Sequence, residues 1–398
     1  MISKYRKEYN ENWSSALYEH FLKGVEETYH HKTPFRIAET PFFIPDLLKS
    51  RLLEACDSIN GVICSPDFKK LTDKAIPDAS LVVPNEDEHT IFLQMDFGIT
   101  LDDKGDPMPK LIEIQGFPSV YFFQEFISRM YRQYFHLPDE LRSFFNPAMD
   151  STSYVELLRE VIVGNENPAH VVMLEIEPEK QTTYIDFLCT ADKLGIKVLC
   201  LTKVIKQDKN LFYEDENGTW VPIKRIYNRV IFDELEQRTD LQLQFSFTDD
   251  LNVYWVGHPN WFYRISKYTM PLLKGKYVPK CYYVGDLESY PDDLENYVLK
   301  PLFSFAGAGV ELNVTKDMLD ALANKSNYLL QEKVSYAPVI DAPGEPVKCE
   351  IRMLMLWPQN SNQPIIINNL VRLSKGAMIG VKYNKDKDWV GGSVGFFE

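Results

Sequence analysis

Apolar and polar residues alternate most regularly over residues 90–99 and again over residues 109–115. The stretch between them, residues 102–106, is polar and contains a glycine, as turns do. Alternation on both sides of such a turn predicts a β-hairpin. Because side chains two residues apart on a strand point to the same side, Glu113 and Gln115 share one face of this hairpin.

Helical periodicity precedes and follows the hairpin. Apolar residues recur at helical spacing from Trp13 to Val25, and residues 46–60 and 120–135 have the same character. We therefore expect helices in these three stretches.

A strand–helix–strand rhythm then runs through residues 169–203. Residues 170–176 and 197–201 are apolar enough for buried strands, and residues 182–194 are amphipathic. Gly195 stands where a helix C-cap glycine belongs. This rhythm predicts an α/β unit.

The second half of the chain contains shorter patterns. We expect a hairpin over residues 211–227 and a helix over residues 260–274. Farther on, the apolar runs predict, in chain order, a strand at 297–301, a small-residue loop with a second strand reaching residue 310, a helix at 316–323, and strands at 328–334, 347–356 and 364–373. The predicted fold class is mixed α/β (α+β).

Composition and charge restrict the kinds of partner. The 398 residues suffice for two or three domains, and 45% hydrophobic and 25% charged residues are ordinary for a globular protein. A net charge of −14 argues against general nucleic-acid binding and against attraction to an anionic membrane. An anionic ligand remains compatible with this charge where the local site is basic.

Cysteine spacing and the N-terminal residues bear on the compartment. The six cysteines form no CxxC pair and no cluster with zinc-binding spacing. No apolar signal core follows the first seven residues, and no run of about 18 uninterrupted apolar residues occurs. We expect a cytoplasmic protein with reduced thiols. The sequence leaves the oligomeric state open.

Lys300 and the loop after it are the first candidate for chemistry. Lys300 supplies a positive charge at the end of a rigid strand. Small residues in the loop leave room for backbone N–H groups to approach phosphate oxygens; they are Ser304, Ala306, Gly307, Ala308 and Gly309. The chain has no G-x-x-x-x-G-K-[ST] motif, so this is not a P-loop. On spacing alone, a glycine-containing β-turn beside an exposed lysine is the commoner explanation.

Residues 300–304, with the Ala/Gly loop, resemble the phosphate-covering loop of glutathionylspermidine synthases and related circularly permuted ATP-grasp ligases. A second segment, which holds Gln331, Glu332 and Val334, is similar to the hinge strand whose backbone meets adenine in those enzymes. Residues 257–267 resemble the segment with an earlier ATP-binding lysine, here Lys267. The resemblance covers residues 88–125 and 255–375 at the level of motifs.

The resemblance implies a circularly permuted ATP-grasp fold with an additional α/β domain of the pre-ATP-grasp type. Residues 1–150 would hold the metal-binding hairpin of the core. Residues 151–255 would form the pre-ATP-grasp-like domain. Residues 256–398 would form the nucleotide-binding lobes.

The same resemblance assigns magnesium to the hairpin, with Asp96 on one strand and Glu113 and Gln115 on the next. Gln115 stands where the family usually has Asn, and Gln94 stands where related synthases carry Arg. Without the resemblance, Asp96 and Glu113 are typical of solvent-facing residues in an antiparallel hairpin.

The implied activity is ADP-forming ligation of a small-molecule carboxylate to an amine. ATP phosphorylates the carboxylate and the amine attacks the acyl phosphate, so the protein contributes positioning and charge neutralisation. Lys267, Lys300 and Arg372 would offset the charge, and Arg352 would orient the acceptor carboxylate through its planar fork. An ion pair with Glu350 explains Arg352 equally well. The sequence does not name the acid or the amine.

Alternatives to a ligase remain open at this stage. Gln94 and Gln115 favour a degenerate ATP-grasp protein that holds nucleotide and ligates nothing. Other candidates are a kinase that stops at phosphoryl transfer and a generic α/β protein without nucleotide.

Three further features permit a functional and a structural interpretation. Arg225 and Arg229 suit an anionic substrate, although a solvated strand edge is the commoner explanation. His258 is expected to make a turn hydrogen bond. Residues 389–395 are either a loop over the cleft or a loose end.

Overall fold

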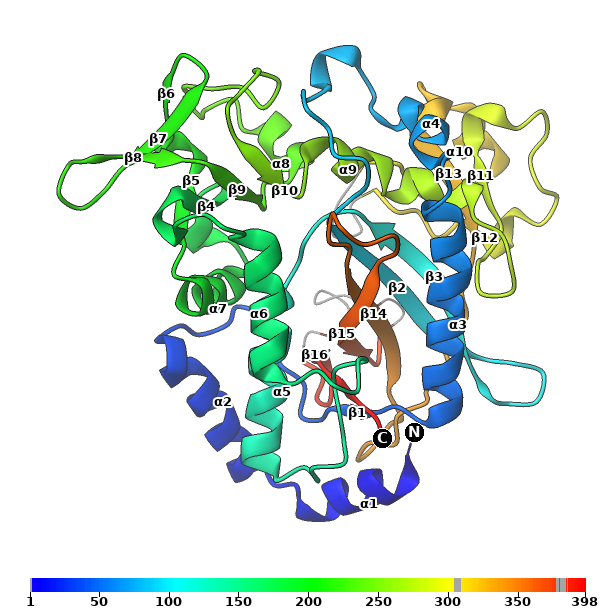
Figure 1. The fold of residues 1–398 in the computed structure, drawn as a ribbon. Helices are drawn as coiled ribbons and strands as arrows, with labels where there is room; N and C mark the ends of the chain where they lie inside the picture. Colours follow the sequence, from blue (N-terminus) through cyan, green and yellow to red (C-terminus); the bar gives the residue numbers. More distant parts are fainter. Residues whose placement is uncertain (1, 304–308, 377–378, 380–383, 385) are drawn as a thin grey trace.

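The structure is a computed structural model that describes residues 2–303, 309–376, 379, 384 and 386–398. A five-stranded antiparallel sheet lies at the centre, with strand order β16-β15-β14-β2-β3 (Figure 1). Its strands are β2 (Phe92–Leu101), β3 (Pro107–Gln115), β14 (Lys348–Leu356), β15 (Ile365–Ser374) and β16 (Gly391–Ser393). The predicted hairpin is confirmed as β2 and β3, and β2 pairs directly with β14 from far along the chain.

Long helices cover the central sheet. α5 packs on β15 and on α2, while α3 packs on β3. The helices of this part are α1 (Ser3–Asn12), α2 (Ser15–Tyr29), α3 (Asp46–Ile63), α4 (Phe68–Leu71), α5 (Tyr121–Phe135) and α6 (Ser151–Ile162). The helices predicted from the apolar spacing near the N-terminus and at 120–135 are confirmed as α2, α3 and α5.

The two ends of the chain meet beside this sheet. β1 (Phe42–Phe43) pairs in parallel with β17 (Gly395–Phe396), and Tyr5 donates a hydrogen bond from its hydroxyl to Glu398 Oε1 over 2.6 Å (Figure 1). Residues 391–393 are β16, an edge strand of the central sheet. The segment that the sequence left as a cleft loop or a loose end is therefore largely strand.

A parallel sheet with order β10-β9-β4-β5 forms the α/β part. It comprises β4 (Val171–Glu175), α7 (Tyr184–Leu194), β5 (Lys197–Cys200), β9 (Arg225–Asn228), α8 (Phe232–Gln237) and β10 (Tyr254–Val256). Gly195 ends α7 with φ of 70°, a left-handed conformation that suits glycine. The predicted α/β unit and its C-cap are thus confirmed.

The hairpin predicted over residues 211–227 is shorter than expected. β6 (Ile205–Gln207), β7 (Asn210–Glu214) and β8 (Trp220–Ile223) form their own antiparallel sheet. The next strand, β9, leaves that sheet and pairs in parallel with β4. The sequence pattern missed this change because both strands have only four residues each.

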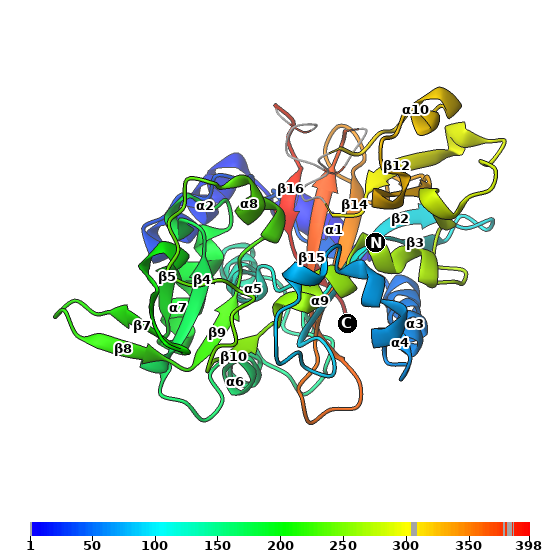
Figure 2. The same ribbon diagram turned by 90° about the horizontal axis from the view of Figure 1, so that it is seen from above.

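A third sheet, with order β11-β13-β12, lies on the opposite side of the central sheet from the parallel sheet (Figure 2). Its elements are β11 (Cys281–Tyr283), β12 (Tyr297–Pro301), α10 (Lys316–Asp320) and β13 (Tyr328–Glu332). The second strand expected near residue 310 is reduced to a single bridge between Leu299 and Glu311.

The helix predicted over residues 260–274 is two shorter pieces. α9 (Pro259–Arg264) is followed by a 3-10 segment, Lys267–Leu272, that begins where the Ser266 side chain accepts from the Tyr268 N–H. Pro271 lies inside that segment, and proline cannot donate the hydrogen bonds of a longer helix. The remaining 3-10 turns are Asp73–Ala75, Ala79–Leu81, Pro168–His170, Pro178–Lys180, Leu201–Lys203, Val284–Asp286, Leu294–Asn296 and Lys325–Asn327.

The described residues form three hydrophobic clusters. The largest lies around the central sheet and its helices, the second beneath the parallel sheet, and the third beside the three-stranded sheet. None of the described helices is both long and apolar enough to cross a membrane.

Candidate functional site

A cavity of about 1740 Å³ lies over one face of the central sheet. The strands contribute residues at two-residue spacing, because alternate side chains of a strand point to the same face. These are Glu113 and Gln115 from β3, Glu350 and Arg352 from β14, and Leu370 and Arg372 from β15. Charged side chains thus face the cavity, while the other face of the same strands packs into the largest cluster.

The three-stranded sheet forms the facing wall. Val298 and Lys300 from β12 and residues 331–336 at the end of β13 line the cavity. Lys300 Nζ donates to the carbonyl oxygen of Ile112 on β3 over 3.2 Å, and Gln331 Nε2 donates to the same oxygen over 3.3 Å. These bonds fix the third sheet against the hairpin.

Two lysines meet a carboxylate between these walls. Lys267 Nζ lies 3.4 Å from Glu113 Oε1, and both residues line the cavity with Lys300. Burial lowers the pKa of Lys300, and the nearby Glu113 carboxylate opposes this shift without cancelling it. The predicted residues Lys267, Lys300 and Glu113 are therefore brought together from three distant segments.

Asp96 lies beneath the arginines of the cavity wall. Arg352 donates to both of its oxygens, from Nε to Oδ1 over 2.6 Å and from Nη2 to Oδ2 over 2.7 Å. Arg372 Nη2 also donates to Oδ2. Burial by itself would raise the pKa of Asp96, but the two guanidinium groups outweigh it and hold the pKa below its ordinary value.

Glu350 holds Arg372 from the other side. Arg372 Nη2 donates to Glu350 Oε1, and the Tyr336 hydroxyl donates to Glu350 Oε2 over 2.8 Å. Burial raises the pKa of Glu350, and Arg372 offsets only part of that shift. The Tyr336 ring packs on Gly98, where an added Cβ would lie 2.7 Å from the ring.

The structure divides the predicted site residues into three groups. Those that line the cavity are Glu113, Gln115, Lys267, Lys300, Gln331, Glu332, Val334, Arg352 and Arg372. Asp96 is buried, with a side chain only 2% exposed. Ser304, Ala306, Gly307 and Ala308 lie outside the described residues, and Gly309 follows them with φ of 68°.

The other end of the cavity was not predicted. Its lining includes Phe35, Arg36, Phe123 and Thr183, from a loop before β1, from α5 and from the loop before α7. Phe35 and Arg36 belong to no predicted element, and the periodicity around Phe123 and Thr183 predicted helices but no role in a site. Glu350 could have been predicted from the sequence, because it precedes Arg352 by two residues on one strand and its side chain therefore points to the same face.

The arginines of the α/β part are structural. Arg229 is buried and pairs with Asp186 Oδ2 over 2.6 Å. Arg225 donates to the carbonyl oxygens of Val161 and Ile162 at the end of α6. Neither residue is the solvated strand edge that the sequence favoured. The predicted turn bond of His258 is confirmed, since its Nδ1 accepts from the Asn260 N–H.

No protein-family model and no curated protein matches the chain. Among solved structures, it is similar to a glutathione synthetase-like effector from Globodera pallida in its apo form. The TM-score is 0.57 at 13% sequence identity, and the match covers 96% of each chain. The chain has a glutathione synthetase-like fold.

This identity is low enough that the similarity shows the fold alone. The sequence pointed to glutathionylspermidine synthase, and that finer assignment stays a prediction. The glutathione synthetase-like fold extends over nearly the whole chain, so it includes both walls of the cavity.

Proposed function

We propose that the chain is an ADP-forming carboxylate–amine ligase of the ATP-grasp type, with ATP and magnesium as its cofactors and a circularly permuted core. One observation carries the proposal. Lys267, Lys300, Glu113 and Gln115 come from three distant segments and line a single cavity. A glycine-containing turn with an exposed lysine does not explain this convergence, because Lys300 is only 9% exposed.

The nucleotide fits the half of the cavity between the two walls. Residues 331–334 at the end of β13 would meet adenine through their backbone. Lys267 and Lys300 would pair with the phosphates as point charges, and the loop after Lys300 would cover them. A lysine whose pKa is lowered by burial regains a favourable charged state when an anion binds beside it.

Magnesium fits the donors of β3. Within the described residues, no three acidic, histidine or cysteine side chains gather into a metal group. Magnesium usually binds through one or two carboxylates, nucleotide phosphates and water, so Glu113 and the Gln115 amide oxygen suffice as protein ligands. When bound, the ion would neutralise phosphate charge. Asp96 as a third ligand stays a prediction.

The arginines would act on the substrates. Arg372 lines the cavity with a side chain 34% exposed, so it can contact an anionic group and offset charge during phosphoryl transfer. Arg352 would orient a carboxylate with the part of its fork that Asp96 leaves unused. The predicted regions 1–150, 151–255 and 256–398 and the cytoplasmic location stay predictions too.

A second function is favoured by the charge balance of the site. Asp96 and Glu350 already pair with the two arginines, so the arginines offer a substrate less net charge than their number suggests. That balance, with Gln94 in place of an expected arginine, suits a protein that binds nucleotide without ligation. The similar solved structure is itself described as an effector.

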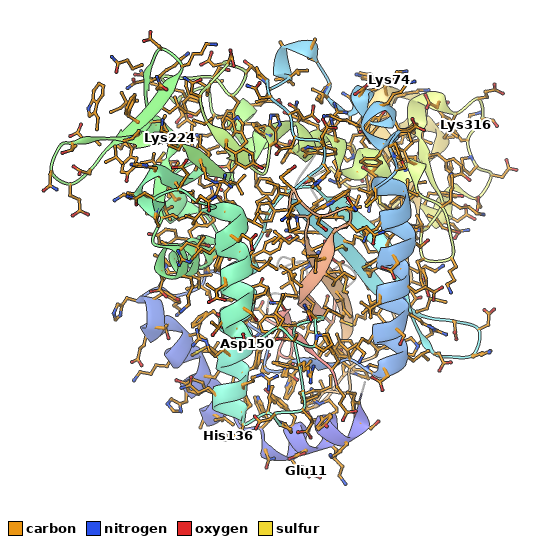
Figure 3. All side chains as sticks on the ribbon, in the orientation of Figure 1. Glu11, Lys74, His136, Asp150, Lys224 and Lys316 are labelled. Carbon is orange, nitrogen blue, oxygen red and sulfur yellow. The ribbon has the colours of Figure 1, made fainter. Side chains whose placement is uncertain are left out.

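Calorimetric titration with ATP tests the nucleotide site. We expect binding that strengthens with magnesium and falls at least about tenfold in Lys300→Met, because the variant loses a buried phosphate-pairing charge. Lys316→Met is the matched control, since Lys316 is exposed at the start of α10 and lies on the outer surface (Figure 3). Equal loss in both variants, or no binding by the unchanged protein, would refute the proposal.

ADP release separates the two functions. The unchanged protein is incubated with ATP, magnesium and pairs of carboxylates and amines, including amino acids, polyamines and short peptides. A ligase releases ADP only when both members of a pair are present. Tight ATP binding with no release for any pair supports the binding protein instead.

A further inference from the structure

We infer that Asp96 is a positioning residue that holds Arg352 and Arg372 in the cavity wall, and that it does not bind the metal. The inference rests on the proposed function only for the identity of the ligand that Arg352 and Arg372 contact. The pairing itself is a property of the described residues.

Both oxygens of the Asp96 carboxylate are used. Arg352 binds it side-on through two N–H groups, the arrangement that matches the planar fork of arginine to a carboxylate. Arg372 Nη2 adds a third donor at Oδ2. Three cationic N–H donors therefore occupy three of the roughly four lone-pair sites of the carboxylate.

Strand register sets this arrangement. Asp96 on β2 lies directly opposite Arg352 on β14, and Glu350 on β14 lies directly opposite Arg372 on β15. Each acid thus faces an arginine on the next strand. Exposure rises from 2% for the Asp96 side chain to 8% for Arg352 and 34% for Arg372, so the acid lies beneath and the arginines face the cavity.

Metal binding by Asp96 would have a high cost. The Asp96 side chain is only 2% exposed, so a metal ion would reach it by displacing Arg352 or Arg372, and a displaced Arg352 would be a buried guanidinium without its partner. Breaking a buried ion pair in this way is strongly destabilising. Glu113 pairs with Lys267 at 3.4 Å, and it lines the cavity with a side chain 26% exposed.

Glu350 also holds Arg372 in position. Arg372 Nη2 lies between Asp96 and Glu350, and the Tyr336 hydroxyl holds Glu350 in turn. A long arginine side chain loses much rotamer freedom when it is fixed, and here that loss occurs on folding and not on ligand binding. Arg372 therefore meets its ligand in a set position.

A double-mutant cycle tests the pairing without any ligand. Asp96→Asn and Arg352→Gln are each expected to lower Tm by several degrees, because the first leaves the buried Arg352 without its counter-charge and the second leaves the buried Asp96 with Arg372 but without its side-on partner. The double variant, which replaces the pair by two amides, should regain at least half of the summed loss. Additive losses would overturn the inference.

The manganese dependence of ATP binding tests the role. The half-saturating Mn²⁺ concentration should rise more than about tenfold in Glu113→Gln and stay within about twofold in Asp96→Asn. ATP affinity itself should fall in Arg372→Lys, and Asp96→Asn/Arg372→Lys should be no weaker than Arg372→Lys alone, because Asp96 acts through Arg372. If Asp96 only stabilised the fold, the losses of ATP affinity in Asp96→Asn and Arg372→Lys would be independent and would add in the double variant.

Two results would contradict the inference. One is a rise in half-saturating Mn²⁺ in Asp96→Asn as large as in Glu113→Gln. The other is an additive loss of ATP affinity in the double variant. Absence of any ATP binding by the unchanged protein would refute the proposed function, and the double-mutant cycle in Tm would still decide whether Asp96 holds the arginines.

Discussion

Glu175 is a buried carboxyl at the end of β4, where its Oε1 accepts from the Ile176 N–H. Burial raises its pKa from 4.5 to about 8, although the Ile176 N–H and Arg229 favour the ionised form; Glu234 adds to the rise. In the unfolded chain the Glu175 carboxyl loses its proton at a lower pH than in the folded protein. Between these two pKa values the folded protein binds more protons, so its stability falls as the pH rises.

Glu175→Gln should remove this dependence. The amide oxygen keeps the bond from Ile176 and carries no charge at any pH. Relative to the unchanged protein, the free energy of unfolding of the variant should gain roughly 2 kcal/mol between about pH 5 and pH 7. Urea unfolding at both pH values measures it. A difference that is the same at both pH values would contradict the assignment.

Asp186 joins two parts of the fold at a single side chain. Its Oδ1 accepts from the N–H groups of Phe122 and Phe123 at the start of α5, and its Oδ2 pairs with the buried Arg229. Asp186→Asn should destabilise the protein by about 3 kcal/mol, because Arg229 would keep a buried charge without its partner. Thermal unfolding measures this.

The control for Asp186 is Asp250, whose pair with Lys209 is more than half exposed on both sides. Asp250→Asn should leave Tm almost unchanged, because exposed ion pairs contribute little. A similar fall in both variants would show that burial is not the cause.

At the scale of elements, Gly98 on β2 leaves room for the Tyr336 ring from the loop after β13. An added Cβ would lie 2.7 Å from the Tyr336 ring, so the ring would have to move and its bond to Glu350 would loosen. Gly98→Ala should destabilise the protein by about 1–3 kcal/mol through overpacking. Thermal unfolding tests it.

Substitution of Gly61 is expected to change the stability in the opposite direction. Gly61 lies inside α3, and no atom of the described residues comes within 4 Å of an added Cβ. Gly61→Ala should stabilise the protein by about 0.5–1 kcal/mol, because alanine favours the helix. Shifts of the same sign in both variants would contradict the packing argument at Gly98.

Local patterns identified the elements that are long or have a clear turn. The hairpin of β2 and β3, the helix α5 and the unit β4–α7–β5 followed from periodicity. The parallel strands β9 and β10 did not, because four and three residues are too few for a period and their partners are distant. The pairing of β2 with β14 also depends on tertiary packing that no local pattern reports.

At the scale of the whole molecule, the site combines predictable and unpredictable parts. Strand residues such as Glu113 and Arg372 were predicted from the resemblance of their segments to a known family, and alternation added only that Glu113 and Gln115 share one face. Arg36, Thr183 and Tyr336 come from loops, whose path depends on the elements they join. The partners of Asp96 needed the register of three strands, β2, β14 and β15, which the sequence alone does not determine.

A structure with a non-hydrolysable ATP analogue and magnesium tests the central claim most directly. The account predicts adenine against residues 331–334, phosphates between Lys267 and Lys300, and the metal on Glu113 and Gln115, with Asp96 still bound to Arg352. Phosphates away from both lysines would contradict the nucleotide site. A metal on Asp96 with Arg352 displaced would contradict the role inferred for that carboxylate.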